Sequence, residues 1–478
     1  MLGDGFLHSS PDALALIPHA MAVKYGVLAG GIVDDELHVF VADVSDDELL
    51  DRIRATCGLR VRPKAAPVDR IRSAIASAYA ADSHPDLEYR DGESPAVRAV
   101  DALHEAAIRA GASDIHVEPT PEGGRARLRV DGMLCEAQTF AGSLYAALVS
   151  RMKLLASMDI SERRQPQDGR YSLECAGRSF DARVSSMPTC SGEKLVVRLL
   201  DLQTHVPSLE SLGMTRVMLA AYREAIHAPS GFIVACGPTG SGKTTTLYAS
   251  LAERNVESQH VCSVEDPVEV HLNGVAQVQV NARAGLTFAS ALRGFLRQDP
   301  NVIMLGEMRD AESASVALSA ALSGQLVVTS LHAADSLGAI ERLMELGVSP
   351  QTLSVGLTAI VAQRLVRVLC TSCRRRVSLG VREAAMLGLR AGVTVFEPQG
   401  CGRCAQQGYR GRVGIFELLT VTDALRHAIA QNQPAFALAQ CAQTRGYRPM
   451  MDMAANAVES GTTSSTEIRR VLGGSEAA

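Results

Sequence analysis

A glycine-rich stretch near the middle of the chain has the residue types and spacing needed to hold a polyphosphate. It matches the pattern G-x-x-x-x-G-K-T, and its residues are Gly237, Pro238, Thr239, Gly240, Ser241, Gly242, Lys243, Thr244 and Thr245. Glycines let successive backbone N–H groups converge on one anion at the N-terminus of a helix. Lys243 adds a mobile positive charge for the β- and γ-phosphates, and the Thr244 hydroxyl is a ligand for Mg²⁺. The stretch therefore predicts a site for ATP and Mg²⁺.

The flanking residues favour this interpretation over a glycine-rich turn that carries a lysine by chance. Residues 231–236 (GFIVAC) are apolar and predict a buried strand, and residues 245–252 can begin a helix. A strand, the loop and a helix in this order are the context that a phosphate-binding loop requires.

Three further residues follow apolar segments and could complete a hydrolytic site. Glu265 ends the strand predicted at 261–264, and we expect it to position or activate the attacking water. Glu307 follows the apolar run 302–305, although Gly306 stands where an ordinary second acidic motif has Asp, so Glu307 must support Mg²⁺ alone. His332 ends another apolar strand and can hydrogen-bond a γ-phosphate. The alternatives are an ordinary loop acid for Glu307 and a structural role for His332.

Four cysteines have the spacing of a metal site. They form two Cys-x-x-Cys pairs, and they are Cys370, Cys373, Cys401 and Cys404. Four thiolates close a tetrahedron around Zn²⁺ and leave no open position, so we expect a structural zinc site; four unrelated reduced cysteines are the alternative. The other seven have no partner spacing and are expected to be small buried residues: Cys57, Cys135, Cys175, Cys190, Cys236, Cys262 and Cys441.

Composition limits the classes of function. The chain has 478 residues, 47% hydrophobic and 21% charged, which suits about three globular domains. A net charge of −5 and only 4% aromatic residues argue against a nucleic-acid partner. The sequence has no apolar run long enough to span a membrane and no signal peptide, so we expect a cytoplasmic location.

The organisation along the chain follows from shifts in composition and from the alternation of strand and helix patterns. The predicted parts are a docking module at 1–81, a linker at 82–95, an α+β domain at 96–202, a linker at 203–213, a P-loop ATPase core at 214–369, a tetracysteine module at 370–415 and a helical region at 416–478.

Two groups of arginines stand out beside these motifs. Arg127, Arg129, Arg183 and Arg198 recur on predicted strands of the second domain, where each could be a solvated charge or could face a triphosphate, including that of a neighbouring subunit. Residues 374–376 are three consecutive arginines, which form either a solvated basic turn or a contact with anionic lipid.

Taken together, these motifs resemble the type II/IV secretion ATPase superfamily, and more narrowly the type II secretion assembly ATPases and the type IV pilus extension ATPases. The segments that carry the resemblance in the third domain and the cysteine module are GPTGSGKTTTLYA, SVEDPVEV, NVIMLGEMRD, SGQLVVTSLHAADS and GCGRCAQQGYRGRVGIFE. The second domain adds ASDIHVEP, RLRVDG, RQPQDGR and RVSSMPTCSGEKLVVRLL. The resemblance covers roughly residues 95 to 470, and the first 80 residues match more loosely.

The resemblance implies an α/β fold and a set of roles. The fold would be a RecA-like P-loop domain with a mostly parallel sheet, preceded by a PAS-like α+β domain and an N-terminal docking module, with a tetracysteine insertion. Glu265 would be the catalytic glutamate, Glu307 the second acid and His332 the sensor, while Arg183 and Arg198 would reach the nucleotide.

The resemblance also implies partners. A homohexamer would work at the cytoplasmic face of the inner membrane, dock through its N-terminal module to a membrane-anchored secretion partner, and drive pseudopilus assembly through a platform protein. The family usually has Gly-His where this chain has Gly324-Gln325, and glutamine cannot become cationic. A DNA translocase and a nucleotide-regulated docking scaffold remain the alternatives from other functional classes.

Overall fold

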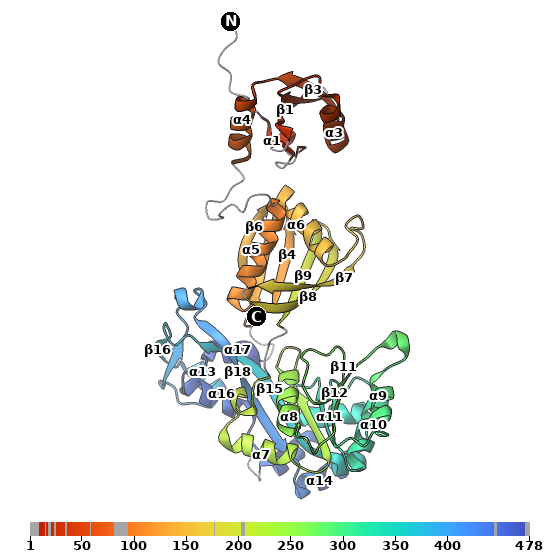
Figure 1. Ribbon diagram of the computed structural model, residues 1–478. Helices are drawn as coiled ribbons and strands as arrows, with labels where there is room; N and C mark the ends of the chain where they lie inside the picture. The colour runs from red at the N-terminus through yellow and green to blue at the C-terminus, as the bar shows by residue number, and fades with distance from the viewer. Residues whose placement is uncertain are drawn as a thin grey trace. The chain divides into compact units, whose positions relative to one another are not determined.

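The computed structural model describes residues 9–473 except 15, 18–20, 23–24, 34–35, 58, 81–93, 176, 202–205 and 444–446. The chain forms two compact units, one made mainly of residues up to Leu199 and the other mainly of residues from Leu200 onward (Figure 1). The predicted linker at 82–95 lies almost wholly outside the described residues.

The N-terminal module is a small α/β unit. Strand β1 (Leu28–Val33) pairs antiparallel with β2 (Glu36–Val41), and β2 pairs parallel with β3 (Arg60–Ala65). The helices are α1 (Pro11–Leu14), α3 (Asp47–Cys57) and α4 (Val68–Ala80). Inward-facing residues such as Leu37, Val39 and Ile53 form its core. The short strand and the two longer helices expected from the sequence are present.

The second domain is built on a six-stranded sheet with the order β6-β5-β4-β9-β8-β7. Its strands are β4 (Asp114–Thr120), β5 (Gly123–Val130), β6 (Met133–Ala141), β7 (Gln167–Cys175), β8 (Arg178–Thr189) and β9 (Gly192–Asp201). Strand β4 pairs antiparallel with β5 and β9, and the helices are α5 (Pro95–Ala110) and α6 (Gly142–Leu155). This is the expected α+β arrangement.

The third domain contains a seven-stranded sheet with the order β12-β11-β13-β14-β10-β15-β18. Its parallel strands are β10 (Gly231–Cys236), β11 (Val261–Glu265), β12 (Val275–Gln279), β13 (Val302–Leu305), β14 (Leu326–Leu331) and β15 (Leu357–Leu369). Strand β18 (Tyr409–Thr420) pairs antiparallel with β15, so the sheet is mostly parallel, as predicted.

Helices accompany this sheet. They are α7 (Arg216–Ile226), α8 (Lys243–Arg254), α9 (Phe288–Phe295), α10 (Ala311–Leu322), α11 (Ser336–Glu345) and α12 (Pro350–Gly356). Alternate residues of β10 enter two different cores: Phe232 and Val234 enter one, and Ile233 and Ala235 enter the other. Burial on both faces explains why these strands are continuous apolar runs in the sequence.

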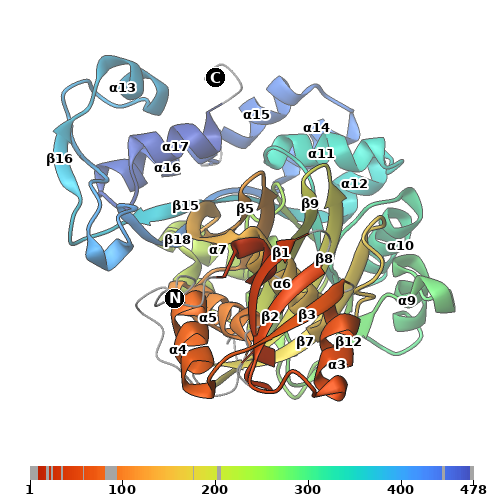
Figure 2. The ribbon, with the colours of Figure 1, turned by 90° about the horizontal axis from the view of Figure 1, so that it is seen from above.

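The cysteine-containing segment and the C-terminal helices complete the domain. Strands β16 (Arg375–Ser378) and β17 (Thr394–Glu397) form a two-stranded sheet beside α13 (Val381–Leu387). The C-terminal helices are α14 (Asp423–Ala430), α15 (Ala435–Gln443), α16 (Met450–Glu459) and α17 (Ser465–Leu472). Figure 2 shows α13 and β16 at the same end of this domain as α16 and α17. Among the described helices, none is long and apolar enough to cross a membrane.

Candidate nucleotide site and metal site

The glycine-rich loop connects β10 to α8, as the sequence predicts. Pro238, Thr239 and Gly240 are exposed, while Gly237 and Ser241 are buried. Gly240 and Gly242 have φ values of 77° and 88°, in the left-handed region that glycine adopts readily. The Ser241 hydroxyl is buried and has no hydrogen-bond partner among the described residues. A flexible run of glycines with an unsatisfied buried donor fits a phosphate group.

Lys243 begins α8 and lies inside the loop. Its Nζ donates to the carbonyl oxygens of Gly237 at 2.8 Å and Pro238 at 3.0 Å. Burial lowers the pKa of Lys243, and the negative charge of Glu307 opposes that shift. Thr244 is partly buried and Thr245 is exposed at the same helix start. The helix N-terminus therefore presents an ammonium group and hydroxyls, which suits Mg²⁺ and phosphate oxygens.

The other predicted residues gather at one edge of the sheet because the strands before them are parallel neighbours. Strand β11 pairs with β13, β13 with β14, and β14 with β10. Glu265, Glu307, His332 and the loop all follow the carboxyl ends of these strands. In open α/β sheets this edge is where ligands bind.

Glu265 is buried, with 3% of its surface exposed, and its carboxylate is surrounded by donors. Ser263 Oγ donates to Oε1 at 2.6 Å and Gln277 Nε2 donates to the same oxygen at 3.1 Å. Tyr248 Oη donates to Oε2 and accepts the backbone N–H of Glu269 at 3.1 Å. Burial and the neighbouring carboxylate raise the pKa of Tyr248, which keeps this hydroxyl a donor. The sequence prediction did not anticipate these partners of Glu265.

Glu307 pairs with a cation that was not predicted from the sequence. Arg309 forms an ion pair with Glu307, and a second guanidinium nitrogen lies 4.0 Å from Asp266. The signal for Arg309 was its position two residues after Glu307 in GEMRD. Together with Lys243, it gives the edge two positive charges.

His332 is exposed at the end of β14. Although the residue is exposed, partial desolvation of its ring lowers the pKa of His332, as do the positive charges of Lys243 and Arg309, and Glu307 partly offsets them. A lowered pKa favours the neutral imidazole near pH 7, which can donate one hydrogen bond and accept another.

The arginines of the second domain are paired within their own sheet. Arg198 Nε donates to Asp114 at 3.0 Å, and Arg183 lies 3.4 Å from Asp181. Arg127 lies 2.8 Å from Glu118, and Arg129 lies 3.7 Å from Asp114. Although burial raises the pKa of Glu118, hydrogen bonds from Arg127 and Lys194 hold it at about 2. The partly exposed Arg183 and the exposed Arg198 stay predicted nucleotide contacts.

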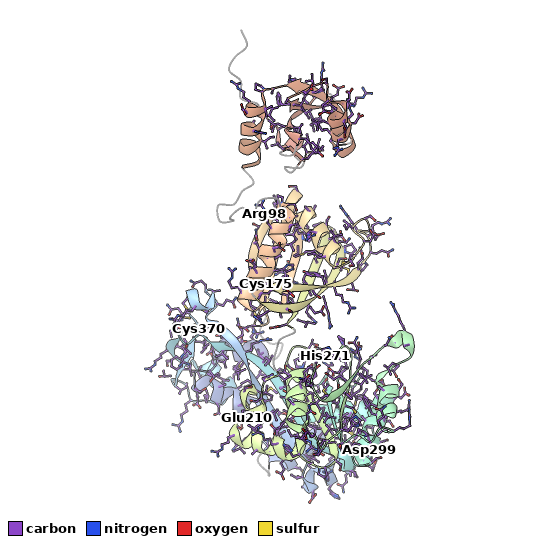
Figure 3. The ribbon with its side chains drawn as sticks, in the orientation of Figure 1. Arg98, Cys175, Glu210, His271, Asp299 and Cys370 are labelled. Atoms are coloured by element: carbon purple, nitrogen blue, oxygen red, sulfur yellow. The ribbon has the colours of Figure 1, made fainter. Side chains whose placement is uncertain are left out.

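The four predicted cysteine ligands converge. Their sulfur atoms all lie within 4.8 Å of one another, with Cys370–Cys401 at 3.9 Å and Cys373–Cys404 at 3.7 Å. Zn–S bonds of about 2.3 Å in a tetrahedron place the sulfurs about 3.8 Å apart, so the cluster fits Zn²⁺. The backbone N–H groups of Cys401 and Gly408 donate to Cys404 Sγ, each at 3.2 Å. Figure 3 labels Cys370, which directly follows β15.

The three arginines after Cys373 have different surroundings. Arg374 donates to the Gly461 carbonyl at 2.5 Å and stacks 4.3 Å from the Phe396 ring centroid. Arg375 and Arg376 are exposed. Arg374 therefore has a structural contact, and for Arg375 and Arg376 a lipid contact stays a prediction beside the alternative of a solvated basic turn.

The fold and the loop define a P-loop nucleoside triphosphatase. The family model described as type II/IV secretion system protein matches residues 89–470, and the model of the MshEN domain matches residues 4–85. The chain belongs to the type II/IV secretion system protein family, which confirms the resemblance seen in the sequence.

Curated relatives include secretion and pilus proteins. The chain is 43% identical over 432 residues to the type II secretion system protein HxcR of Pseudomonas aeruginosa, covering 90% of this chain and 88% of that protein. It is 38% identical over 483 residues to the type IV pilus assembly ATPase PilB of Myxococcus xanthus, covering 92% of this chain and 85% of that protein. The chain is thus a secretion ATPase in the broad sense that includes pilus motors.

Solved structures of related ATPases have the same fold. The pilus retraction motor PilT with bound ADP is 25% identical, with a TM-score of 0.50, and the match covers 74% of this chain and 96% of that one. The Legionella pneumophila ATPase DotB is 22% identical, with a TM-score of 0.59, and covers 81% of this chain and 97% of that one.

Proposed function

We propose that this chain is the ATPase motor of a type II secretion system. The observation that carries the proposal is a phosphate loop whose expected catalytic partners meet at one edge of the sheet. The chain that contains this loop matches the type II protein HxcR over 88% of the length of HxcR. The motor would act as a homohexamer on the cytoplasmic face of the inner membrane. Its N-terminal module would dock to a membrane-anchored secretion partner, and the hexamer would drive pseudopilus assembly through a platform protein.

In the proposed mechanism, the loop residues bind the phosphates, and the residues at the edge of the sheet support Mg²⁺ and the attacking water. Backbone N–H groups of the phosphate loop, which spans Gly237–Thr245, and the Lys243 ammonium would bind the phosphates of ATP. Mg²⁺ bound by Thr244 and supported by Glu307 would neutralise charge on the phosphates. Glu265 would orient the attacking water, and His332 would hydrogen-bond the γ-phosphate. The negative charge that develops while the γ-phosphoryl group is transferred would need nearby cations, and the candidates are Arg309, Arg183 and Arg198.

The surroundings of Glu265 add a condition to this mechanism. Its oxygens already accept from Tyr248, Ser263 and Gln277, so an attacking water would have to use the acceptor position that remains. Tyr248 also accepts the backbone N–H of Glu269, which connects the surroundings of Glu265 to the loop that contains Glu269.

We also propose that Zn²⁺ occupies the four-cysteine cluster in a structural role. Four thiolates at tetrahedral spacing leave no position for a substrate, so this ion would stabilise the segment rather than take part in hydrolysis. Anionic lipid near Arg375 and Arg376 is a further candidate partner.

The test is the substitution Lys243→Ala in the full chain. Loss of the ammonium group should abolish binding of a fluorescent ATP analogue and the release of phosphate. It should also abolish secretion in a complementation assay. Lys64→Ala, which removes an exposed lysine of the N-terminal module, is the control for binding and phosphate release. Secretion that persists in the Lys243→Ala strain would refute the proposal that this chain is the secretion motor.

A type IV pilus assembly ATPase is the second candidate, because the match to PilB extends over 92% of this chain. Co-purification with membrane partners separates the two. Recovery of type II secretion components supports our proposal, and recovery of a pilus platform supports the second candidate. Phosphate release stimulated by DNA with a steep salt dependence would instead indicate a translocase, and ATP binding with no phosphate release a scaffold.

A further inference from the structure

Gln363 lies in the middle of β15, the strand that pairs with β10 on the side away from β14. Its side chain is 1% exposed, which makes it one of the buried polar residues of the third domain. A buried amide is unfavourable unless its donor and acceptor are both paired. The hydrogen-bond partners of Gln363 therefore indicate its structural role.

Both partners belong to the phosphate loop and the helix that follows it. Gln363 Nε2 donates to the backbone carbonyl of Ser241 at 2.9 Å. Gln363 Oε1 accepts from Thr246 Oγ1, also at 2.9 Å. One side chain thus connects the last part of the loop to the first turn of α8.

The backbone of the loop is packed directly against the same residue. A Cβ atom placed on Gly237 would lie 2.6 Å from the Gln363 carbonyl oxygen, and one placed on Gly242 would lie 3.2 Å from Gln363 Nε2. Gly237 and Gly242 are therefore needed for close approach to β15 as well as for the curvature of the loop.

Arg364 extends the connection to the segment after His332. Its guanidinium donates to the carbonyl of Ala334 at 2.6 Å and to that of Gln363 at 3.0 Å. Two consecutive residues of β15 thus contact both the phosphate loop and the segment that carries the predicted sensor.

We propose that Gln363 is a positioning residue that fixes the peptide plane between Ser241 and Gly242. In a trans peptide the carbonyl and the following N–H point in opposite directions. Holding the Ser241 carbonyl toward β15 therefore directs the Gly242 N–H away from β15, where it can donate to a phosphate. Gln363 makes the loop ready for the nucleotide without touching it. The proposal rests on the proposed binding of nucleotide by this loop.

The experiment measures the Kd of the full chain for a fluorescent ADP analogue. Gln363→Leu keeps a similar volume but removes both hydrogen bonds, and we expect binding to weaken about tenfold. Thr246→Val is nearly isosteric and removes one of the two bonds, so we expect a smaller loss of affinity. In the double variant the two losses should not add, since they act through one contact.

Tyr222→Phe is the matched control. Tyr222 is fully buried, and its hydroxyl lies 2.8 Å from Ser250 Oγ, one turn beyond Thr246 on α8. This change removes a buried hydrogen bond to the same helix but away from the loop, so it should lower the Tm and leave the Kd unchanged.

The outcomes are separable. A wild-type chain that fails to bind the ADP analogue would contradict the nucleotide site itself. A wild-type chain that binds, together with Gln363→Leu or Thr246→Val variants of unchanged Kd, would contradict the role of Gln363. If Gln363→Leu does not fold, the Kd of the Thr246→Val variant alone tests the role of Gln363.

Discussion

Glu265 combines a buried carboxylate with three protein donors at the edge of the sheet that faces the phosphate loop. These donors fix the orientation of the Glu265 carboxyl group at the end of β11. A charged carboxylate is the form that can accept a proton from water. The same donors leave one acceptor position of the carboxylate for that water.

We expect Glu265→Gln to bind ATP normally but to release phosphate at least about 100-fold more slowly, because an amide cannot act as a base. The amide nitrogen would also face Tyr248, Ser263 or Gln277, so a loss of stability of about 1–3 kcal/mol should accompany it. Nucleotide titration, phosphate release and thermal unfolding measure the three effects.

Glu269→Gln is the control, since this exposed carboxylate belongs to the same acidic segment. It should retain turnover. Phosphate release by Glu265→Gln at a rate close to that of the wild-type chain would remove Glu265 from the catalytic role.

We expect His104 on α5 to make the second domain less stable in acid. Its Nε2 lies 2.5 Å from Tyr171 Oη, and burial lowers the pKa of the imidazole from 6.5 to about 4. At pH values between about 4 and 6.5, His104 binds a proton in the unfolded chain but not in the folded chain. The free energy of unfolding should therefore fall as the pH drops from about 6.5 to 4, by about 3 kcal/mol in total.

Hydrogen exchange of α5 at pH 7 and at pH 4.5, corrected for intrinsic rates, measures this loss. His104→Gln removes the titrating group, so its α5 should be less protected at pH 7 but should change less between the two pH values. Equal changes in the variant and the wild-type chain would assign the acid sensitivity to other groups.

Single residues were predictable where their position along the chain determines their position in space. Glu265, Glu307 and His332 each follow an apolar strand, and parallel strands bring such residues to one edge. Tyr248 and Gln363 were not predictable in this way. Their contacts depend on which strands are neighbours and on side-chain direction, neither of which the spacing specifies.

At the scale of elements, β15 and β18 connect the sheet to the cysteine cluster. Cys370 directly follows β15, and Tyr409 begins β18 shortly after Cys404. The pairing of these strands reaches Leu369 opposite Tyr409, next to the cluster. Strand β18 also crosses the predicted boundary at residue 415, so the cysteine segment is an extension of the sheet's edge.

We expect the purified chain to contain one zinc ion, and Cys404→Ser to lose it. Loss of the ion removes a cross-link between the ends of β15 and β18, which should destabilise the domain by about 3 kcal/mol or more. Metal analysis and thermal unfolding test this. The prediction that the seven other cysteines are buried is correct for Cys236 and Cys262 and wrong for the exposed Cys190 and for the partly buried Cys57, Cys135, Cys175 and Cys441. Cys190 provides the control, because Cys190→Ser should keep both the zinc and the Tm. Full zinc content in Cys404→Ser would contradict the assignment.

The elements differ in how well the sequence predicts them. Strands β10, β11, β13 and β14 are short apolar runs, because both their faces are buried. Strand β15 was missed, since its residues after Ala362 include Gln363, Arg364 and Arg367, which make contacts specific to this fold. A polar residue that is buried for its hydrogen bonds looks like a surface residue in the sequence.

At the scale of the whole molecule, the proposed hexamer predicts sites shared between subunits. Arg198 is 66% exposed despite its contact with Asp114, so it remains available to a neighbouring subunit. We expect both Lys243→Ala and Arg198→Ala to be inactive alone. A mixture should recover activity, because some interfaces would combine an intact Lys243 with an intact Arg198 from the other variant.

Phosphate release after co-assembly measures the recovery. Subunits that carry both substitutions, mixed with either single variant, are the control and should stay inactive. A mixture no more active than its separate components would place Arg198 in the site of its own subunit or outside any site.

Gly306 restricts how this protein can change over evolutionary time. A Cβ atom there would lie 3.2 Å from the Val264 carbonyl oxygen and 3.4 Å from Glu265 Cα. The ordinary Asp at this position would therefore crowd β11 and place a second negative charge beside Glu265. On the proposed mechanism Glu307 is the acid of this motif that supports Mg²⁺, and a Gly306→Asp substitution would have to displace the end of β11 to add a second one.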